Sequence, residues 1–300
     1  MSFRYDISVI IVSYNCLDAL KDCLNSIAAQ DGVTFDIISV DNASSDGSGD
    51  YLKNQHFKKI LSSRNLGFGA AVNLAVGQAE GLYLLMLNPD TSLPLGALQS
   101  LFEFAECHPN AGIVSAMLIS LDGGIQLSAR KLPRRRDFFL GRGSPLFRFG
   151  ITNEKEAGYI IPPDEQPLQV PSVSATALLI KHEIFTNIGG FDPRFFMYLE
   201  DVDLCRRISG NGFEIWMLPS VKIKHSWRKS SKSRPYFASF QHHLSVYKYF
   251  SKYNPGQVFH NLLLLIFLVF GYFANSFITI IGRQVRRPDG TGGLGGRRES

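Results

Sequence analysis

The chain has 300 residues, of which 45% are hydrophobic and 19% are charged. This composition excludes a chain without a core and allows one large or two small domains. The formal net charge of +5 indicates anionic surroundings, such as phosphorylated ligands, nucleic acid or a membrane surface.

The cysteine pattern and the N-terminal residues indicate in which cellular compartment the protein is found. Cys16, Cys23, Cys107 and Cys205 form no C-x-x-C pair, and the opening residues do not have the form of a secretory signal. We therefore expect reduced core cysteines in a protein made and kept in the cytosol.

The first 120 residues alternate strand and helix patterns. The β-branched run at residues 7–14 predicts a strand buried on both faces. Leucine and isoleucine then recur at helical spacing from Leu17 to Ile27, with Asn15 as the expected N-cap. Further strands are expected at residues 35–42, 58–63, 81–90 and 111–120, with helices in residues 65–79 and 95–108. This alternation predicts an α/β fold with a doubly wound, mostly parallel sheet that binds ligands at the carboxyl ends of its strands.

The second half is less regular. Residues 121–171 are turn-rich and predict a long excursion, in which Arg130, Lys131 and Arg134 to Arg136 lie near Phe138 and Phe139. This basic and aromatic cluster suits a solvated loop or docking on an anionic bilayer. Residues 173–191 predict a strand and a short helix ended by Gly189 and Gly190, and residues 213–227 predict one or two strands.

The C-terminal part is distinct, because residues 258–281 contain no Asp, Glu, Lys or Arg. A helix of this stretch would be roughly 36 Å long, against a hydrocarbon core of about 30 Å. A spanning helix, an in-plane or re-entrant helix and a buried core helix all remain open, and flanking basic residues at both ends give no direction. A polar stripe along it faces headgroups, a partner helix or the protein body; it contains Asn261, Tyr272, Asn275, Ser276 and Thr279. We expect a catalytic domain at 1–235, a helical membrane-associating segment at 236–285 and a disordered basic tail at 286–300.

Polar residues close three of the predicted strands. Tyr14 and Asn15 end the first, Asp41 ends the second and Asp90 ends the fourth. Any one of them is explained as a cap or a turn residue, but three strand ends together indicate a ligand site.

The glycine motifs limit the kinds of ligand site that the chain can form. No G-x-G-x-x-G follows the first strand and no P-loop is present, which disfavours a Rossmann site and excludes a P-loop site. Gly67 and Gly69 either admit a diphosphate at a helix start or serve close helix packing. Asp90, after a stiffening proline, suits Mg²⁺ or Mn²⁺ held together with phosphate oxygens, and His225 is either a further ligand or structural.

The carboxylates Glu200, Asp201 and Asp203 directly follow an aromatic, apolar run. A helix N-terminus favours acids on electrostatic grounds alone. A partly buried carboxylate among like charges can also serve as a general base.

Five ordered stretches, VIIVSYN, VDNASSDGS, NLGFGAAVN, LNPD and GGFDPRFFMYLEDVDLCRR, together resemble the family 2 glycosyltransferases. The resemblance covers about residues 6 to 230 and is nearest to the rhamnosyltransferase branch that builds bacterial surface polysaccharide. It implies a GT-A fold, a nucleotide-sugar donor, a divalent cation (Mg²⁺ or Mn²⁺) and inversion at the anomeric carbon.

The same resemblance implies roles for single positions. Asp201 matches the catalytic base, and Asp90 and His225 match metal ligands. Glu200 and Asp203 would bind the acceptor, or pair with Arg206 or Arg207 to position the loop. Asn88 replaces the first acid of the family's D-x-D, so the cation is expected to be held more loosely. The donor would be bound by Ser13, Tyr14, Asn15, Asp41, Asn65, Gly67 and Asn88, with Tyr14 and Asp41 at the base.

The expected function is an inverting glycosyltransferase on the cytoplasmic face of the inner membrane. It would move L-rhamnose from dTDP-rhamnose to a hydroxyl of a lipid-linked or growing surface polysaccharide. The alternatives are a galactofuranosyl or other hexosyl transferase that uses a UDP-sugar, and a non-catalytic nucleotide-sugar-binding scaffold. A nucleotidyltransferase is disfavoured because no glycine- and arginine-rich loop follows the first strand, and no known module supports nucleic-acid binding.

Overall fold

The computed structural model describes residues 3–135, 137, 158–226 and 235–285, with side chains of the last segment described for residues 236–273. Arg136, Phe138 and Phe139 of the basic and aromatic cluster, and the tail at 286–300, lie outside the described residues.

The strands are β1 (Tyr5–Ser13), β2 (Phe35–Asp41), β3 (Lys58–Leu61), β4 (Gly81–Leu87), β5 (Thr91–Ser92), β6 (Ala111–Ile119), β7 (Ile125–Gln126), β8 (Ala129–Arg130), β9 (Leu168–Gln169), β10 (Ser172–Val173), β11 (Ala177–Lys181) and β12 (Glu214–His225). The helices are α1 (Leu17–Ala28), α2 (Ser48–Lys53), α3 (Phe68–Val76), α4 (Ala97–Cys107), α7 (His182–Asn187), α8 (Glu200–Gly210), α10 (Pro235–Tyr253) and α11 (Val258–Val285).

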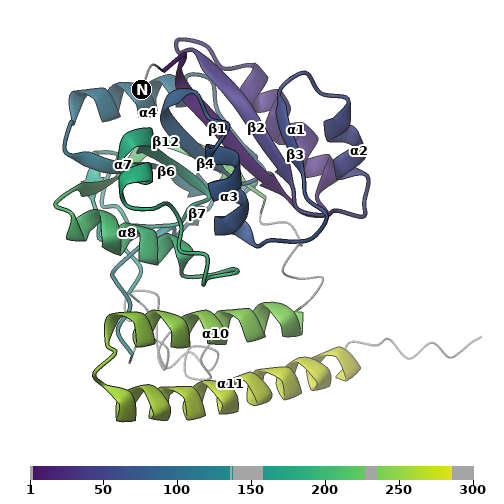
Figure 1. Ribbon diagram of the computed structural model, residues 1–300, viewed down its shortest axis with the longest axis vertical. Coiled ribbons are helices and arrows are strands. Elements are labelled where there is room, and N and C mark those ends of the chain that lie inside the picture. Colours follow the sequence, from purple (N-terminus) through teal and green to yellow (C-terminus); the bar gives the residue numbers. More distant parts are fainter. Residues whose placement is uncertain (1–2, 136, 138–157, 227–234, 286–300) are drawn as a thin grey trace, which may run out of the picture.

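One twisted sheet organises the described residues, with strand order β3-β2-β1-β4-β11-β6-β12-β5 (Figure 1). Strands β3, β2, β1 and β4 are parallel to one another, as are β6 and β12, so the predicted mostly parallel sheet is confirmed. The structure adds a feature that the alternation did not predict: β11 lies antiparallel between β4 and β6. The carboxyl ends of β1, β2 and β4 therefore share one edge of the sheet.

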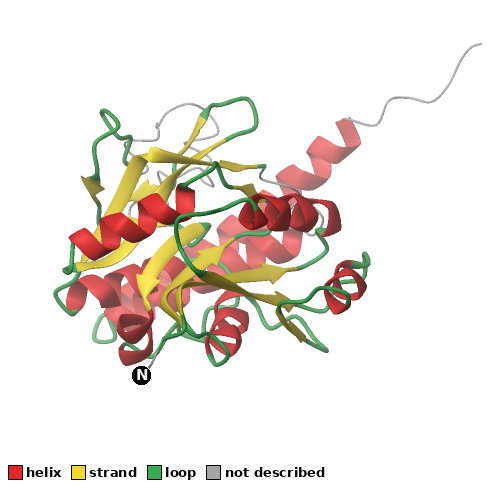
Figure 2. Cartoon of the chain, turned by 90° about the horizontal axis from the view of Figure 1, so that it is seen from above, coloured by secondary structure: helices red, strands yellow, loops and turns green. Residues whose placement is uncertain are grey.

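Apolar helix faces cover both sides of the sheet (Figure 2). On one side the core joins α1 and α4 to inward residues of β1, β4 and β12. On the other side α3, α7 and α8 pack on the alternate residues of the same strands. Strands buried on both faces explain the near-continuous apolar runs of the sequence.

Helices α10 and α11 run antiparallel below the sheet domain (Figure 1). Phe195, Leu199 and Val202, from the start of α8 and the loop before it, pack there on Tyr249 of α10 and Leu264 of α11, all five buried. The C-terminal helices thus lie against the acidic stretch. Within the part of the chain that the structure describes, no helix meets the length and hydropathy needed to cross a bilayer.

The polar stripe of α11 is described at two positions, and both face the protein body. Asn261 is buried and accepts a hydrogen bond from Arg135 at 2.7 Å. The Tyr272 ring packs edge-on against Phe240 and His243 of α10. Of the three predicted orientations, these contacts favour the body.

Two local predictions are wrong. The N-cap of α1 is Cys16 rather than Asn15, because the carboxylate of Asp46 reaches across from the β2–α2 turn and accepts the hydrogen bond of the Leu17 N–H at 2.9 Å. The four cysteines were expected in the core, but Cys107 is exposed at the end of α4.

A buried ion-pair cluster fastens α10 to α8. Asp203 is completely buried and bonds to Arg207 at 2.8 Å, to the Tyr253 hydroxyl at 2.8 Å and to Lys252 at 2.5 Å. Lys252 also bonds to Asp192 at 2.7 Å. Although partial burial acts to raise it, hydrogen bonds from Arg194 and Lys252 hold the pKa of Asp192 well below its ordinary value.

We expect Lys252→Met to lower the free energy of unfolding by about 3 kcal/mol, because it leaves a buried carboxylate with one cation fewer. Urea unfolding at pH 7 measures this, with Lys222→Met as control, since the Lys222–Glu165 pair is exposed. The lowered pKa of Asp192 adds stability that is present above about pH 4 and lost as the pH falls toward its folded-state pKa. Equal midpoints for the two variants at pH 7 would show that the cluster does not stabilise the fold.

Candidate functional site

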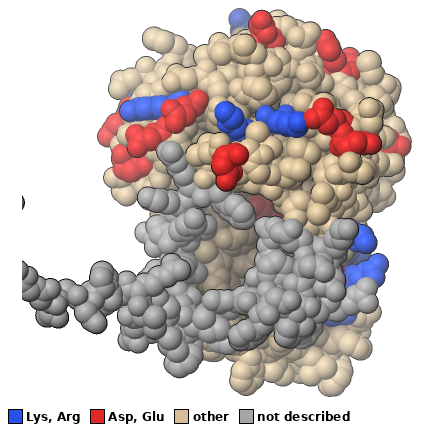
Figure 3. Space-filling model, turned by 180° about the vertical axis from the view of Figure 1, so that it is seen from behind, with Lys and Arg blue, Asp and Glu red and all other residues tan. Residues whose placement is uncertain are grey.

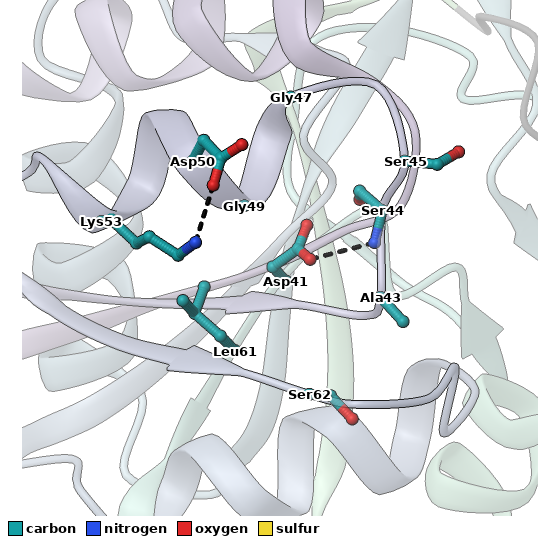
Figure 4. Close-up of a pocket in the computed structure, with 10 residues that line it drawn as sticks. All are labelled: Asp41, Ala43, Ser44, Ser45, Gly47, Gly49, Asp50, Lys53, Leu61 and Ser62. Atoms are coloured by element: carbon teal, nitrogen blue, oxygen red, sulfur yellow. Dashed lines mark hydrogen bonds and ion pairs between the residues drawn. The ribbon is translucent and has the colours of Figure 1, made fainter.

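A pocket of about 420 Å³ lies at the carboxyl end of β2 (Figure 4). Asp41 is 4% exposed there, and its carboxylate accepts the Ser44 N–H at 3.0 Å. Ser13, buried at the end of β1, lies behind it with Oγ 3.4 Å from the Asp41 carboxylate. Across the opening stands the exposed Asp50–Lys53 pair. A carboxylate in a pocket lined mainly by polar residues and glycine can accept an N–H from a ligand.

The loop after β1 interlocks with the turn after β2. The Asn15 N–H donates to Ser44 Oγ at 2.9 Å, and the Ser45 N–H donates to Asn15 Oδ1 at 2.7 Å. Asn15 (φ 51°) and Ala43 (φ 64°) both adopt the left-handed conformation that non-glycine residues rarely take. Backbone strain of this kind concentrates at functional loops. Tyr14, between Ser13 and Asn15, is half-buried beside this junction.

Asn42 ties the glycine-rich loop to the end of β2. Its side chain donates to Asn65 Oδ1 at 3.0 Å and to the Gly67 carbonyl at 3.2 Å, and it accepts the Leu66 N–H at 2.8 Å. Asn65 in turn accepts the Gly67 N–H. Three of the four hydrogen-bonding positions of this buried amide are therefore satisfied by the loop.

The glycine-rich loop also touches the segment that leads into α8. A Cβ on Gly67 (φ 83°) would lie 2.3 Å from the Phe196 carbonyl, and the Phe68 N–H donates to that carbonyl at 3.1 Å. Asn73 on α3 exchanges two hydrogen bonds with the backbone of Phe191. Close packing thus accounts for Gly67, and the diphosphate role remains a prediction.

Asp90 and His225 meet between β4 and the end of β12. Asp90 Oδ1 lies 3.2 Å from His225 Nε2, and the two side chains are 13% and 10% exposed. Burial raises the pKa of the Cys16 thiol to about 12, although a backbone hydrogen bond of Tyr14 acts in the opposite direction. The negative charges of Asp46, Asp90 and Asp41 raise this pKa further. The charges of Asp41 and Asp90 therefore both reach the Cys16 thiol at this edge of the sheet.

The Asp90–His225 pair fits a divalent cation. Adjacent ligands of an octahedral ion at about 2.1 Å stand roughly 3 Å apart, and carboxylate and imidazole are both suitable donors. Among the residues that the structure describes, no group of three or more His, Cys, Asp or Glu is arranged to hold a metal. The remaining ligands would therefore be phosphate oxygens of the donor and water. Asn88 is engaged with Thr176, its N–H donating to the Thr176 carbonyl at 2.9 Å.

The acid pair stands at the first turn of α8. Tyr198 (φ 70°) and Leu199 (φ 60°) are successive left-handed residues just before it. The Asp201 carboxylate, 14% exposed, accepts a hydrogen bond from Arg130 at 3.3 Å. Glu200 is buried, and its Oε2 has no hydrogen-bond partner among the residues that the structure describes. Burial, followed by the neighbouring Asp201 charge, raises the pKa of Glu200 to about 8. Two adjacent carboxyls thus occupy different environments, as acid and base groups need.

For Asp203 the structure shows pairing with Arg207, one of the two roles that the sequence left open. Arg206 instead stacks over the Tyr253 ring at 3.8 Å. The acceptor role stays a prediction for Glu200 and Asp203; the side-chain hydrogen bonds described for Asp203 all belong to the cluster with α10.

A continuous chain of contacts connects these parts. Asp41 and Asn42 are consecutive, Asn42 holds the Gly67 loop, and that loop touches the segment entering α8. Arg130 then joins Asp201 to β8, and Gln126 of β7 bonds to His225 beside Asp90. Gln126 and Arg130 are four residues apart, so their Cα atoms lie no more than about 14 Å from each other. Contacts between described residues thus connect the pocket, the Asp90–His225 pair and the acid pair, while the lining of the pocket itself includes Asp41 but not Asp90, His225 or Asp201.

Three residues of this region were not predicted from the sequence. Asn42 directly follows Asp41, and the sequence pattern indicates the carboxylate as the functional residue of that strand end. Gln126 and Arg130 lie in two-residue strands without hydrophobic periodicity, far in sequence from His225 and Asp201. Only the cluster of basic residues drew attention to Arg130, and it suggested a loop or a bilayer instead.

Comparison with known proteins gives consistent findings. Residues 8–202 match the family model described as "Glycosyl transferase family 2". The chain is 28% identical over 267 residues to an "N-acetylglucosaminyl-diphospho-decaprenol L-rhamnosyltransferase" of Mycobacterium tuberculosis, covering 83% of this chain and 85% of that one. It is 29% identical over 260 residues to "Rhamnosyltransferase WbbL" of Escherichia coli, covering 81% and 92%.

Solved structures agree on the fold. The mannosyltransferase PcManGT from Pyrobaculum calidifontis, in complex with GDP-Man and Mn²⁺, has a TM-score of 0.56 at 17% identity, covering 95% of this chain and 81% of its own. GalNAc-T7 with UDP, GalNAc and Mn²⁺ has a TM-score of 0.56 at 16% identity, and this chain spans 44% of its length. The expected GT-A fold is confirmed.

Proposed function

The chain belongs to glycosyl transferase family 2, and on that premise we propose that it transfers L-rhamnose from dTDP-rhamnose to a lipid-linked saccharide, inverting the anomeric carbon. That it is a glycosyltransferase follows from its family and relatives. The observation that carries the proposal is the contact chain linking the Asp41 pocket, the Asp90–His225 pair and Asp201. The rhamnosyltransferase relatives support the sugar and, for one of them, the lipid-linked acceptor.

On the donor side, the nucleotide base occupies the pocket at Asp41. The Asp41 carboxylate accepts the N–H of the pyrimidine ring, and Tyr14 stacks on the ring from the end of β1. The Asn65–Gly67 loop, held by Asn42, lines the ribose and diphosphate, with Asn88 beside it. A divalent cation, Mg²⁺ or Mn²⁺, held by Asp90 and His225 would neutralise charge on the departing diphosphate.

On the acceptor side, Asp201 acts as the general base. The acceptor hydroxyl oxygen bonds to C1 of the sugar as the C1–O bond to the diphosphate breaks with its electron pair, and the hydroxyl proton passes to the Asp201 carboxylate. Arg130 holds that carboxylate in place. Glu200 is largely protonated near neutral pH because its pKa is raised to about 8, and its Oε2, which no described residue bonds, is the atom that would bind the acceptor.

A donor screen by product mass spectrometry tests the proposal. The purified full chain is incubated with Mn²⁺, N-acetylglucosaminyl-diphospho-prenol and dTDP-rhamnose, UDP-galactofuranose or UDP-glucose in separate reactions. We expect a deoxyhexose adduct with dTDP-rhamnose at least about tenfold faster than any hexose adduct, a difference of about 1.4 kcal/mol. A dominant hexose adduct would support the UDP-sugar alternative and contradict rhamnose.

We also propose that the outward face of α11 docks on an anionic bilayer. Phe259, Phe270 and Phe273 on that face are 67%, 73% and 65% exposed. Residues 235–285 contain no Asp or Glu, and Arg135 is anchored at the start of α11 through Gln257 and Asn261. On the face in Figure 3, acidic and basic side chains are interspersed on the upper body, and basic side chains lie at the edge of the lower part. An apolar face with a basic margin suits the surface of anionic lipid.

We propose the cytoplasmic face of the inner membrane as the enzyme's location, which the four free cysteines support. Vesicle flotation tests the docking with bilayers containing phosphatidylglycerol. We expect Phe259→Ser with Phe270→Ser to lower recovery with vesicles at least about fivefold, since two buried aromatic side chains are worth several kcal/mol. Leu95→Ser, which removes a 77% exposed leucine before α4, serves as the control. Equal recovery of all three proteins would remove α11 as the docking surface.

A further inference from the structure

The side-chain amide of Gln126 contacts His225 through both its nitrogen and its oxygen. Its Nε2 donates to the His225 backbone carbonyl at 2.8 Å, and its Oε1 lies 2.7 Å from His225 Nδ1. A carbonyl only accepts hydrogen bonds, so the end of the amide that faces it must be the nitrogen. The amide orientation is therefore set by the backbone, and the oxygen faces the ring.

An oxygen facing Nδ1 determines the tautomer of His225. Since Oε1 can only accept, Nδ1 must carry the ring proton, and in the neutral ring Nε2 is left with its lone pair. Nε2 is the atom that lies 3.2 Å from Asp90 Oδ1. Two lone pairs facing each other at that distance attract a positive charge between them.

The surrounding structure keeps this arrangement rigid. Gln126 belongs to β7, which pairs antiparallel with β6, and β6 pairs with β12. His225 is the last residue of β12 and is paired with Thr91 of β5. The amide and the imidazole are thus fixed on strands of one sheet, and Asp90 immediately precedes β5.

We propose that Gln126 is a positioning residue for the donor's cation: it holds the Nδ1–H tautomer and the ring orientation of His225, so that Nε2 is presented to the metal beside Asp90. The inference rests on the cation of the proposed function. It assigns to the chain a hydrogen bond of the kind that orients histidine ligands in metal sites, where the second ring nitrogen donates to an oxygen.

The alternative is that Gln126 only joins β7 to β12. The two roles differ for Gln126→Glu, which keeps an oxygen acceptor toward Nδ1–H but has no donor for the backbone carbonyl. A positioning role predicts that Gln126→Glu retains the tautomer while Gln126→Met loses it. A joining role predicts similar damage in both.

The test measures tautomer and metal affinity separately. Two-bond ¹H–¹⁵N correlation spectra of ¹⁵N-histidine-labelled, metal-free full chain at pH 8 report which ring nitrogen carries the proton, with His225→Gln identifying the signal. Free Mn²⁺ measured by electron paramagnetic resonance in the presence of dTDP reports affinity. Gln169→Met, an exposed glutamine of β9, is the matched control, and thermal melting checks that each variant is folded.

We expect the Nδ1–H form in the wild type and in Gln126→Glu, and a mixed or Nε2–H form in Gln126→Met. Mn²⁺ affinity should fall about 10- to 100-fold in Gln126→Met and stay unchanged in Gln169→Met. An Nε2–H tautomer in the wild type, or Mn²⁺ affinity within about twofold in a folded Gln126→Met, would overturn the proposal. If these expectations are met while the donor screen yields no rhamnosyl product, the proposed donor fails and the role of Gln126 stands.

Discussion

Replacing Asp201 with asparagine should lower kcat for sugar transfer by about 10²- to 10⁴-fold, the range that a positioned general base contributes. The amide has nearly the shape of the carboxylate but cannot take the proton of the acceptor hydroxyl. In the proposed mechanism, donor binding depends on the Asp41 pocket and the Asp90–His225 pair, which the substitution leaves intact. Affinity for dTDP with Mn²⁺, measured by calorimetry, should therefore stay within about twofold of the wild type.

Glu200→Gln is the matched control for Asp201→Asn. Glu200 adjoins Asp201, but burial raises its pKa to about 8, so at pH 7 glutamine resembles its protonated form. We expect the control to keep much of its kcat at that pH. Normal turnover of Asp201→Asn together with an inactive Glu200→Gln would assign the base to Glu200 instead.

Replacing either residue of the Asp90–His225 pair should lower activity to a similar extent, but by weakening the binding of the cation. Asp90→Asn and His225→Gln are each expected to lower kcat/KM by about 10³-fold, because a metal that neutralises developing charge is worth several kcal/mol, at about tenfold per 1.36 kcal/mol. Unlike Asp201→Asn, both should weaken the binding of dTDP with Mn²⁺. Chelation with EDTA should silence the wild type, and added Mn²⁺ should restore it.

His108→Gln controls for the loss of a histidine outside the pair, since His108 stacks on Phe104 at the end of α4. It should bind dTDP and Mn²⁺ as the wild type does. Full activity of the wild type in excess EDTA would contradict a role for the cation in this chain.

Much of the fold was predictable because the first half of the chain carries its information locally. The apolar runs at β1, β2 and β4 are largely buried, so each is recognisable as a strand without knowledge of its neighbours. The antiparallel insertion of β11 was not predictable in this way, since the direction of a strand depends on the path of the chain before it. The same holds for the cap of α1, where Asp46 acts from another loop. The GT-A fold itself came from the resemblance of ordered motifs.

The site shows the same division. Asp41 and Asp90 stand directly after strong strand patterns, and the topology brings strand ends of a parallel sheet together. Arg130 and Gln126 lie in two-residue strands, and their hydrogen-bond partners, Asp201 and His225, are 71 and 99 residues away in sequence. Such distant pairings cannot be predicted from local patterns. The role of Asp203 was also ambiguous, because its pairing with Lys252 and Tyr253 needs α10 folded against α8.

The most direct test of one shared site is a crystal structure of the wild-type chain with dTDP and Mn²⁺, with anomalous diffraction recorded at the manganese edge. We predict one manganese peak in contact with Asp90 Oδ1 and His225 Nε2, and a thymine ring beside the Asp41 carboxylate in the same molecule. Manganese bound away from that pair, or thymine bound outside the pocket at the end of β2, would contradict the account.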